Sequence, residues 1–234
     1  MPFNKMLAAI TPNTLSKIVT HPFNVELCRG TLPAPKYRAF LEQDRLYLIG
    51  FAETLKRVAE RLPNSRHQRL FHQLSEEAFK TQVNLHGKYF LTHKTPNLFQ
   101  PPPLSAVKIP VVFDYTAYLH TTAKNDPIEV AVGSLIPCFF IYSHLGRCMQ
   151  STINENNPYR RWIESYSSER FLLATQSIIQ TIKELFDELP AADEEKTIAA
   201  FIKSTEFEMA FWDAIYGASY EDRDEISLTC CSRF

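Results

Sequence analysis

Apolar residues recur at helical spacing along most of the chain, and this periodicity constrains the fold more than any other feature. Between Pro35 and Pro63, aromatic and aliphatic side chains are separated mainly by three or four positions. That spacing places them on one face of a helix, whereas a half-buried strand would show alternation. Only six glycines occur in the 234 residues, which argues against a sheet protein built from tight hairpins. The sequence therefore predicts an all-α chain.

The same pattern predicts where the helices lie and how they are organised. The first should bend or break at Pro22 and stop at Gly30. The proline-rich link 93–110 is predicted to be a long loop within a single domain, because the helices on both sides keep apolar stripes that need cover. That domain should span 1–216, followed by an irregular tail over 217–234. Helices are expected over 12–28, 35–63, 66–90, 111–123, 128–153, 158–189 and 193–216.

Composition excludes several classes of partner. The chain has 25 Lys and Arg against 26 Asp and Glu, with no dense basic cluster, so nucleic acid is not expected to bind. Its five cysteines have neither a disulfide-framework spacing nor a Cys-x-x-Cys pair. No apolar run reaches the roughly 20 residues of a membrane span, and no signal peptide is recognised. We expect a cytoplasmic protein without a membrane partner.

A few polar side chains interrupt the apolar stripes, and these are the candidate functional residues. Asp44 lies between Phe and Leu positions, Glu208 lies beside Phe211, and Cys138 is followed four residues later by Tyr142 in the most apolar stretch. Burying such groups costs free energy unless they are hydrogen-bonded. Each also has a purely structural interpretation: a core thiol, an Asp paired to a neighbouring helix, or a surface Glu.

Taken together, these segments resemble the TenA family, also called thiaminase II or aminopyrimidine aminohydrolase. The resemblance spans roughly residues 15–216, and it does not extend to the loop 93–110 or to the tail with Cys230-Cys231. The matching residues are His21-Pro22-Phe23, Leu27, Gly30-Thr31-Leu32, Phe40-Leu41-Glu42-Gln43-Asp44, Tyr47-Leu48, Phe51, Tyr115-Thr116, Tyr118-Leu119, Pro137-Cys138, Tyr142, Gly146, Tyr159, Trp162-Ile163, Tyr166, Glu208 and Phe211-Trp212.

The resemblance implies a haem-oxygenase-like helical bundle that assembles as a homotetramer and needs no cofactor or metal. It also implies hydrolysis of 4-amino-5-aminomethyl-2-methylpyrimidine to the hydroxymethyl pyrimidine in thiamine salvage, with thiamine cleavage as a further activity. The implied catalytic residues are Cys138 as nucleophile, Glu208 as acid and base, Tyr142 and Tyr166; the implied substrate-binding residues are Asp44, Tyr47, Tyr115 and Phe211.

The residue types suit that chemistry. Expelling an amine from the exocyclic methylene is slow, and a thiolate that adds to the pyrimidine ring assists it. A free thiol has a pKa near 8.5, so a neighbouring base must help Cys138. Apolar walls should raise the pKa of Glu208, which lets it protonate the leaving amine.

Two other functions stay open at this point. One is a non-catalytic pyrimidine-binding or regulatory protein, which would need Asp44 and aromatic walls but no thiol. The other is a metal-dependent oxidase on the same scaffold, yet none of the seven histidines follows a carboxylate at the three-residue spacing of a di-iron helix. The exact amine, and whether the pathway is salvage or degradation, do not follow from the sequence.

Overall fold

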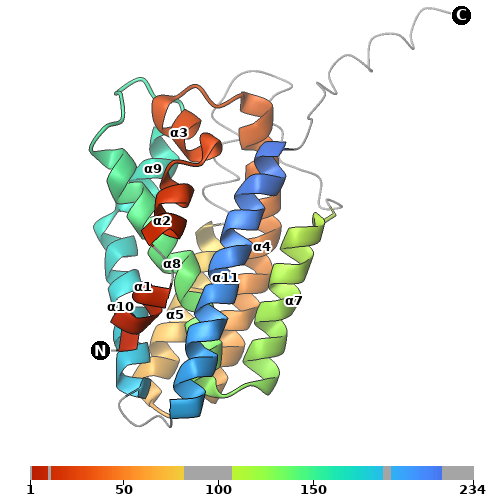
Figure 1. Ribbon diagram of the computed structural model, residues 1–234, viewed down its shortest axis with the longest axis vertical. Coiled ribbons are helices and arrows are strands. Elements are labelled where there is room, and N and C mark those ends of the chain that lie inside the picture. The colour runs from red at the N-terminus through yellow and green to blue at the C-terminus, as the bar shows by residue number, and fades with distance from the viewer. Residues whose placement is uncertain (1, 10–11, 82–106, 187–190, 218–234) are drawn as a thin grey trace, which may run out of the picture.

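The computed structural model describes residues 2–9, 12–81, 107–186 and 191–217. These residues form helices and their connections, and the long helices lie side by side in an elongated bundle (Figure 1). The all-α prediction is confirmed for this part of the chain. In chain order the helices are α1 (Pro2–Ala9), α2 (Pro12–Val19), α3 (Pro22–Arg29), α4 (Ala34–Arg61), α5 (Ser65–Thr81), α7 (Pro110–Asn125), α8 (Ile128–Gln150), α9 (Arg160–Ser167), α10 (Glu169–Phe186) and α11 (Ala191–Gly217).

Helix α8 forms the centre of the bundle and packs against α4, α7, α9, α10 and α11. By length and composition alone α8 could cross a membrane, but its most apolar stretch is 78% buried inside the bundle. A helix that is apolar on all sides is expected in the core of a helical protein. Cys138 and Tyr142 lie on α8 and are buried with it.

Gly146 allows α9 to approach α8 closely. A Cβ atom at this position would lie 2.6 Å from the carbonyl carbon of Tyr166, so any larger residue would push the two helices apart. This contact places the Tyr166 ring 4.9 Å from the Tyr142 ring, measured between centroids. A glycine on one helix therefore helps to position a phenol on another.

Helices α7 and α11 pack against each other and run in opposite directions, as the colours in Figure 1 show. The start of α7 therefore meets the end of α11. Tyr115 comes early in α7 and Glu208 comes late in α11, so the antiparallel arrangement brings them together. Helix α4 packs against both and adds Asp44 and Tyr47 from its first half.

One predicted helix was wrong, and one helix was missed. The single helix expected over 158–189 is two helices, because the backbone of Ser168 is extended, with ψ of 147°. The Ser168 hydroxyl accepts a hydrogen bond from the Phe171 backbone N–H at 3.2 Å, which caps the start of α10. The N-terminal helix α1 was not predicted at all.

Other boundary predictions are confirmed. The first helical segment is interrupted before Pro22, and α3 ends at Gly30, whose φ of 74° is the left-handed conformation that glycine adopts easily. The described part of the predicted helix 66–90 is α5. The remainder of that helix, most of the proline-rich loop 93–110 and the tail beyond Gly217 lie outside the described residues.

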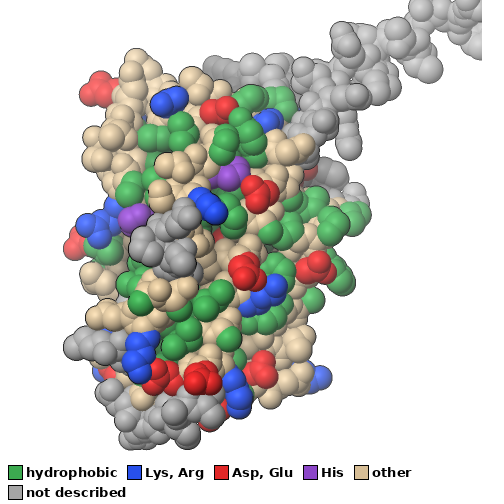
Figure 2. Space-filling view, viewed as in Figure 1, with side chains coloured by type: hydrophobic (Ala, Val, Ile, Leu, Met, Phe, Trp, Pro, Cys, Tyr) green, Lys and Arg blue, Asp and Glu red, His purple; other side chains and the backbone are tan. Residues whose placement is uncertain are grey.

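The face shown in Figure 2 carries acidic and basic side chains interspersed with hydrophobic ones, without a broad area of one charge. Charged side chains also pair across helices: Lys5 of α1 lies 2.5 Å from Glu194 of α11. Exposed pairs of this kind contribute little to stability.

Candidate active site

The structure brings together all eight side chains that were singled out from the sequence. They come from five different helices, and between 2% and 9% of each remains exposed. They are Asp44 and Tyr47 from α4, Tyr115 from α7, Cys138 and Tyr142 from α8, Tyr166 from α9, and Glu208 and Phe211 from α11.

Glu208 is a buried carboxyl group whose hydrogen-bond partner is a phenol rather than a Lys or Arg. The Tyr115 hydroxyl donates to Oε1 of Glu208 at 3.1 Å. Burial raises the pKa of Glu208 to about 8, and the negative charge of Asp44 adds to this, while the bond from Tyr115 opposes it. The predicted rise in the pKa of Glu208 is confirmed. Near neutral pH the group can therefore both donate and accept a proton.

Cys138 is buried close to both carboxyl groups. Burial raises the pKa of the Cys138 thiol well above its ordinary value, and the charges of Glu208 and Asp44 raise it further. The Tyr47 phenol acts in the opposite direction, because hydrogen bonding to sulfur favours the thiolate. At neutral pH the resting group is a thiol, so its use as a nucleophile requires a neighbouring base.

Aromatic rings enclose this polar cluster from two sides. On one side Tyr115 lies between Tyr47 and Phe207, with ring centroids 5.0 Å and 4.9 Å away and the rings nearly parallel. On the other side Tyr142 and Tyr166 are in contact at 4.9 Å. Burial raises the pKa of all four phenols, so they are neutral hydrogen-bond donors at physiological pH.

Asp44 brings a second buried carboxyl group, of which 2% is exposed. Its charge is the second cause, after burial, of the raised pKa of Tyr166, and it also acts on Tyr142 and Cys138. Asp44 therefore lies within electrostatic reach of the thiol and of the phenols on α8 and α9. A planar ligand that carries adjacent N–H donors would be a natural partner for such a carboxylate.

The cavity at this site is small. Its volume is about 10 Å³, which is enough for about one water molecule. The cavity walls come from α4, α7, α8 and α11, and they include the first turn of α7. They are formed by Tyr47, Val111, Val112, Tyr115, Tyr142, Glu208 and Phe211.

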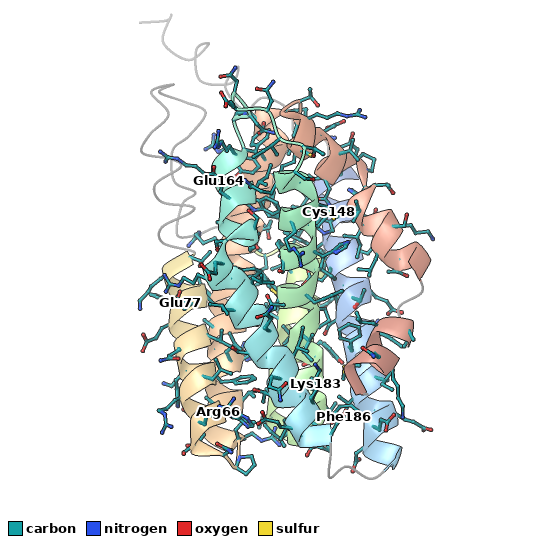
Figure 3. All side chains as sticks on the ribbon, turned by 90° about the vertical axis from the view of Figure 1, so that its left-hand side faces the viewer. Arg66, Glu77, Cys148, Glu164, Lys183 and Phe186 are labelled. Carbon is teal, nitrogen blue, oxygen red and sulfur yellow. The ribbon has the colours of Figure 1, made fainter. Side chains whose placement is uncertain are left out.

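A larger cavity, of about 430 Å³, lies elsewhere, between α2, α3 and the end of α8. Its lining includes Asn24, Cys28, Arg29 and Cys148, and lacks the buried carboxyl groups and the phenols. Figure 3 shows Cys148 near the end of α8, away from the middle of the bundle. Size alone would select this cavity, but Glu208, which can perform acid and base chemistry, lines the smaller one together with the phenols. Cys138 does not line it, but Glu208 and Tyr47 of its wall both act on the Cys138 thiol.

Sequence reasoning missed two polar residues of this site. Ser204 is fully buried one turn before Glu208, and its hydroxyl lies close enough to Tyr115 to lower the pKa of that phenol. The four-residue spacing from Glu208 was a signal that could have identified it. Gln43 was noted only as part of a motif, and it holds the chain that leads into α7.

Within the part of the chain that the structure describes, no three His, Cys, Asp or Glu side chains come together as metal ligands would. Two buried carboxyl groups and one thiol are present near one another, but the nearby polar groups are phenols. The donor set is therefore suited to proton transfer and nucleophilic chemistry.

Comparisons with known proteins identify relatives of this chain. An aminopyrimidine aminohydrolase of Helicobacter pylori is 26% identical over 208 residues, which are 85% of this chain and 91% of that protein. Longer proteins match as well. The chain spans only 26–36% of the length of the first curated relatives it matches, which are named for thiamine biosynthesis or as hydroxymethylpyrimidine/phosphomethylpyrimidine kinases.

Solved structures confirm the expected fold. A TenA homologue from Pyrococcus furiosus superposes with a TM-score of 0.83 at 17% identity, covering 92% of this chain and 100% of that one. A Shewanella denitrificans domain with a heme oxygenase-like fold superposes with a TM-score of 0.67 at 13% identity, covering 99% and 97%. The bundle is thus haem-oxygenase-like. The model of the TENA/THI-4/PQQC family matches residues 7–218, so this chain belongs to that family.

Proposed function

We propose that this protein is an aminopyrimidine aminohydrolase that converts 4-amino-5-aminomethyl-2-methylpyrimidine and water into the hydroxymethyl pyrimidine and ammonia. The observation that carries the proposal is the burial of Cys138 and Glu208 in one site, with the pKa of Glu208 raised to about 8. A protein that only bound pyrimidines would need a polar contact and aromatic walls, but neither a thiol nor a proton-exchanging carboxyl group.

The relatives support the substrate class. Aminopyrimidine aminohydrolases of three bacteria match 84–85% of this chain at 20–26% identity. The longer relatives carry names from thiamine biosynthesis and pyrimidine phosphorylation. We therefore propose thiamine salvage as the pathway, with thiamine cleavage as a further activity of the same site.

In the proposed reaction Cys138 passes its proton to the Glu208 carboxylate and forms a C–S bond to the pyrimidine ring. The electron pair released into the ring expels the amine from the exocyclic methylene, and Glu208 supplies the proton that the departing amine takes. Water then adds to the methylene and returns a proton to the Glu208 carboxylate. The C–S bond breaks, which restores the ring, and the thiolate takes the proton back from Glu208, which restores the resting thiol and the carboxylate. The net change is one water in and one ammonia out.

The remaining residues bind and orient the substrate in this proposal. Asp44 holds the ring amino group and the adjacent ring nitrogen, and Tyr115 and Phe211 enclose the ring. Tyr115 also holds the Glu208 carboxyl group through the bond at 3.1 Å. The other phenols stabilise the thiolate region by hydrogen bonds; they are Tyr47, Tyr142 and Tyr166.

The direct test is ammonia release from the aminomethylpyrimidine by the purified protein, with the Cys138→Ser variant as control. We expect turnover by the wild type and almost none by the variant. Pyrimidine binding without ammonia release would instead support the non-catalytic binding function. Thiamine supplied to the same preparation, with its two ring fragments separated by chromatography, tests the cleavage activity.

We also propose a cytoplasmic homotetramer whose single domain spans residues 1–216, with 217–234 as a tail. Light scattering should then give four times the 27.0 kDa chain mass. A mass equal to one or two chains would contradict the assembly and leave the proposed chemistry untouched.

A further inference from the structure

Gln43 connects α4 to the segment that leads into α7. Its side chain is 8% exposed, and both ends of its amide bond the same short stretch of backbone. Nε2 donates to the Val107 carbonyl oxygen at 3.1 Å, and Oε1 accepts from the Ile109 N–H at 2.9 Å. A carbonyl needs a donor and an N–H needs an acceptor, so these partners define the orientation of the amide.

Among the described residues few other contacts hold this segment in place, although the partly buried Ile109 side chain packs against the core. The Val107 side chain is 83% exposed, and α7 begins without a side-chain cap at Ile109. Lys108 donates to the Thr116 hydroxyl at 2.9 Å, but Thr116 belongs to α7 itself, so that bond does not link the segment to another helix. The two bonds of the Gln43 amide therefore attach residues 107–109 to α4, and the charge attraction between Lys108 and Glu53 acts between the same two elements.

The segment continues directly into a wall of the candidate active site. Val111 and Val112 belong to the first turn of α7 and line the cavity opposite groups from other helices. The Ile109 carbonyl accepts the Phe113 N–H at 3.0 Å, so the residue held by Gln43 is also hydrogen-bonded to that first turn. A shift of residues 107–109 would carry the valines with it.

The wall must move for a substrate to enter. The cavity of about 10 Å³ is far below the roughly 300–1,000 Å³ of ordinary ligand sites. The other lining residues lie within α4, α8 and α11 or deeper in α7, whereas Val111 and Val112 lie at a helix end, where local opening costs least.

We propose that Gln43 is a positioning residue that holds this wall closed and so sets the access of an aminopyrimidine to Cys138. The inference rests on the proposed function for the identity of the ligand. Tyr47 and Glu208 line the cavity and also act on the Cys138 thiol, so opening of the wall should expose that thiol. The exposure does not depend on turnover, and it can be measured separately.

The test is the rate at which iodoacetamide alkylates Cys138, followed by mass spectrometry of its peptide. Gln43→Ala should raise this rate at least fivefold. Gln43→Met keeps the side-chain length without either hydrogen bond and should do the same, so the measurement survives if the alanine variant does not fold. Cys148 is exposed and serves as the internal reference, with an unchanged rate in every variant (Figure 3).

Gln68 offers a matched control. Its amide donates to the Leu62 carbonyl at 2.8 Å in the connection between α4 and α5. Gln68 follows Gln43 by 25 positions, and its bond lies beyond the far end of α4. Gln68→Ala should leave the alkylation of Cys138 unchanged. Equal rates in wild type and both Gln43 variants, or an equal rise in Gln68→Ala, would overturn the proposal.

Kinetics separate this inference from the proposed function. The valine wall would contact the ring in ground and transition states alike, so Gln43→Met should raise KM with little change in kcat. A wild type without ammonia release, combined with faster alkylation in the Gln43 variants, would remove the function and keep the role of Gln43. Ammonia release by the wild type, combined with unchanged alkylation in the Gln43 variants, would support the proposed function and remove the role of Gln43.

Discussion

Helix α8 carries two thiols with opposite surroundings. Cys138 is 9% exposed and lies among two carboxyl groups and the Tyr47 phenol, whereas Cys148 is exposed and lies 3.7 Å from His144. The two are ten residues apart, which is about 15 Å along a helix. One cysteine of α8 therefore lies in a buried site with two carboxyl groups, and the other lies at the solvent-exposed surface.

The comparison teaches that the reactivity of a helix-borne thiol is determined by the helices around it. The neighbour of Cys148 is His144 of α8 itself, whereas the groups with the largest effects on the Cys138 thiol come from other helices. Glu208 comes from α11, and Tyr47 and Asp44 come from α4. We therefore expect substitutions of the buried partners of Cys138 to lower turnover. Matched substitutions on the surface of the same helices should leave turnover unchanged.

The largest effect is expected at the thiols themselves. Cys138→Ser should lower kcat by about 100-fold or more, because a hydroxyl is a far poorer nucleophile than a thiolate at neutral pH. Cys148→Ser should stay within about twofold of the wild type, since Cys148 has no part in the proposed reaction. Both are checked by ammonia release, with circular dichroism to confirm folding. Activity of Cys138→Ser within tenfold of wild type would eliminate the covalent mechanism.

Glu208 provides the next contrast, with Glu206 as the surface control on α11. Glu208→Gln should lower kcat by roughly 50-fold with little change in KM, because an amide keeps the shape but exchanges no proton. Glu206 is exposed and paired with Lys203 at 3.2 Å, so Glu206→Gln should be nearly silent. Steady-state kinetics on both variants decide: full activity of Glu208→Gln would remove Glu208 from the mechanism.

How far the sequence predicts these contrasts depends on where each partner comes from. The burial of Asp44 follows from apolar neighbours on its own helix, so periodicity was sufficient to predict it. For Glu208 the same pattern left a surface position open, and the structure shows the side chain buried. The break at Ser168 depends on a local cap, and a serine followed by Glu169 was a usable signal for it. The resemblance to one family, in the order and spacing of its motifs, predicted that the eight residues form one site. Periodicity alone does not predict this.

The role of Gln43 could not be predicted in this way. Its partners are backbone groups at Val107 and Ile109, more than 60 positions away, and backbone atoms carry no residue type that a sequence pattern can reveal. The small volume of the cavity is likewise a property of packing between helices. Both features depend on tertiary structure.

Asp44 tests the acidic surroundings on α4. Asp44→Asn should raise KM roughly tenfold and lower turnover as well, because the carboxylate is proposed to hold the pyrimidine edge in ground and transition states. Glu42 lies on the same helix and is half-buried, at 3.8 Å from Arg38, so Glu42→Gln is the matched control. Substrate titrations give both constants. An unchanged KM in Asp44→Asn would contradict the binding role.

The smallest effect concerns stability and pH. The pKa of Glu208 is raised from 4.5 to about 8 on folding, so its contribution favours the folded state below pH 4.5 and is lost as pH rises towards 8. Glu208→Gln removes this titration. The melting temperature of the variant minus that of the wild type should therefore increase from pH 5 to pH 8. Even about 1 kcal/mol of this linkage moves Tm by roughly 2–4 °C in a chain of this size. Glu206→Gln should follow the wild-type curve, because the exposed pair of Glu206 with Lys203 contributes little to stability. Melting curves at pH 5, 6.5 and 8 make the comparison, and a constant gap between Glu208→Gln and wild type would mean that Glu208 does not titrate in this range.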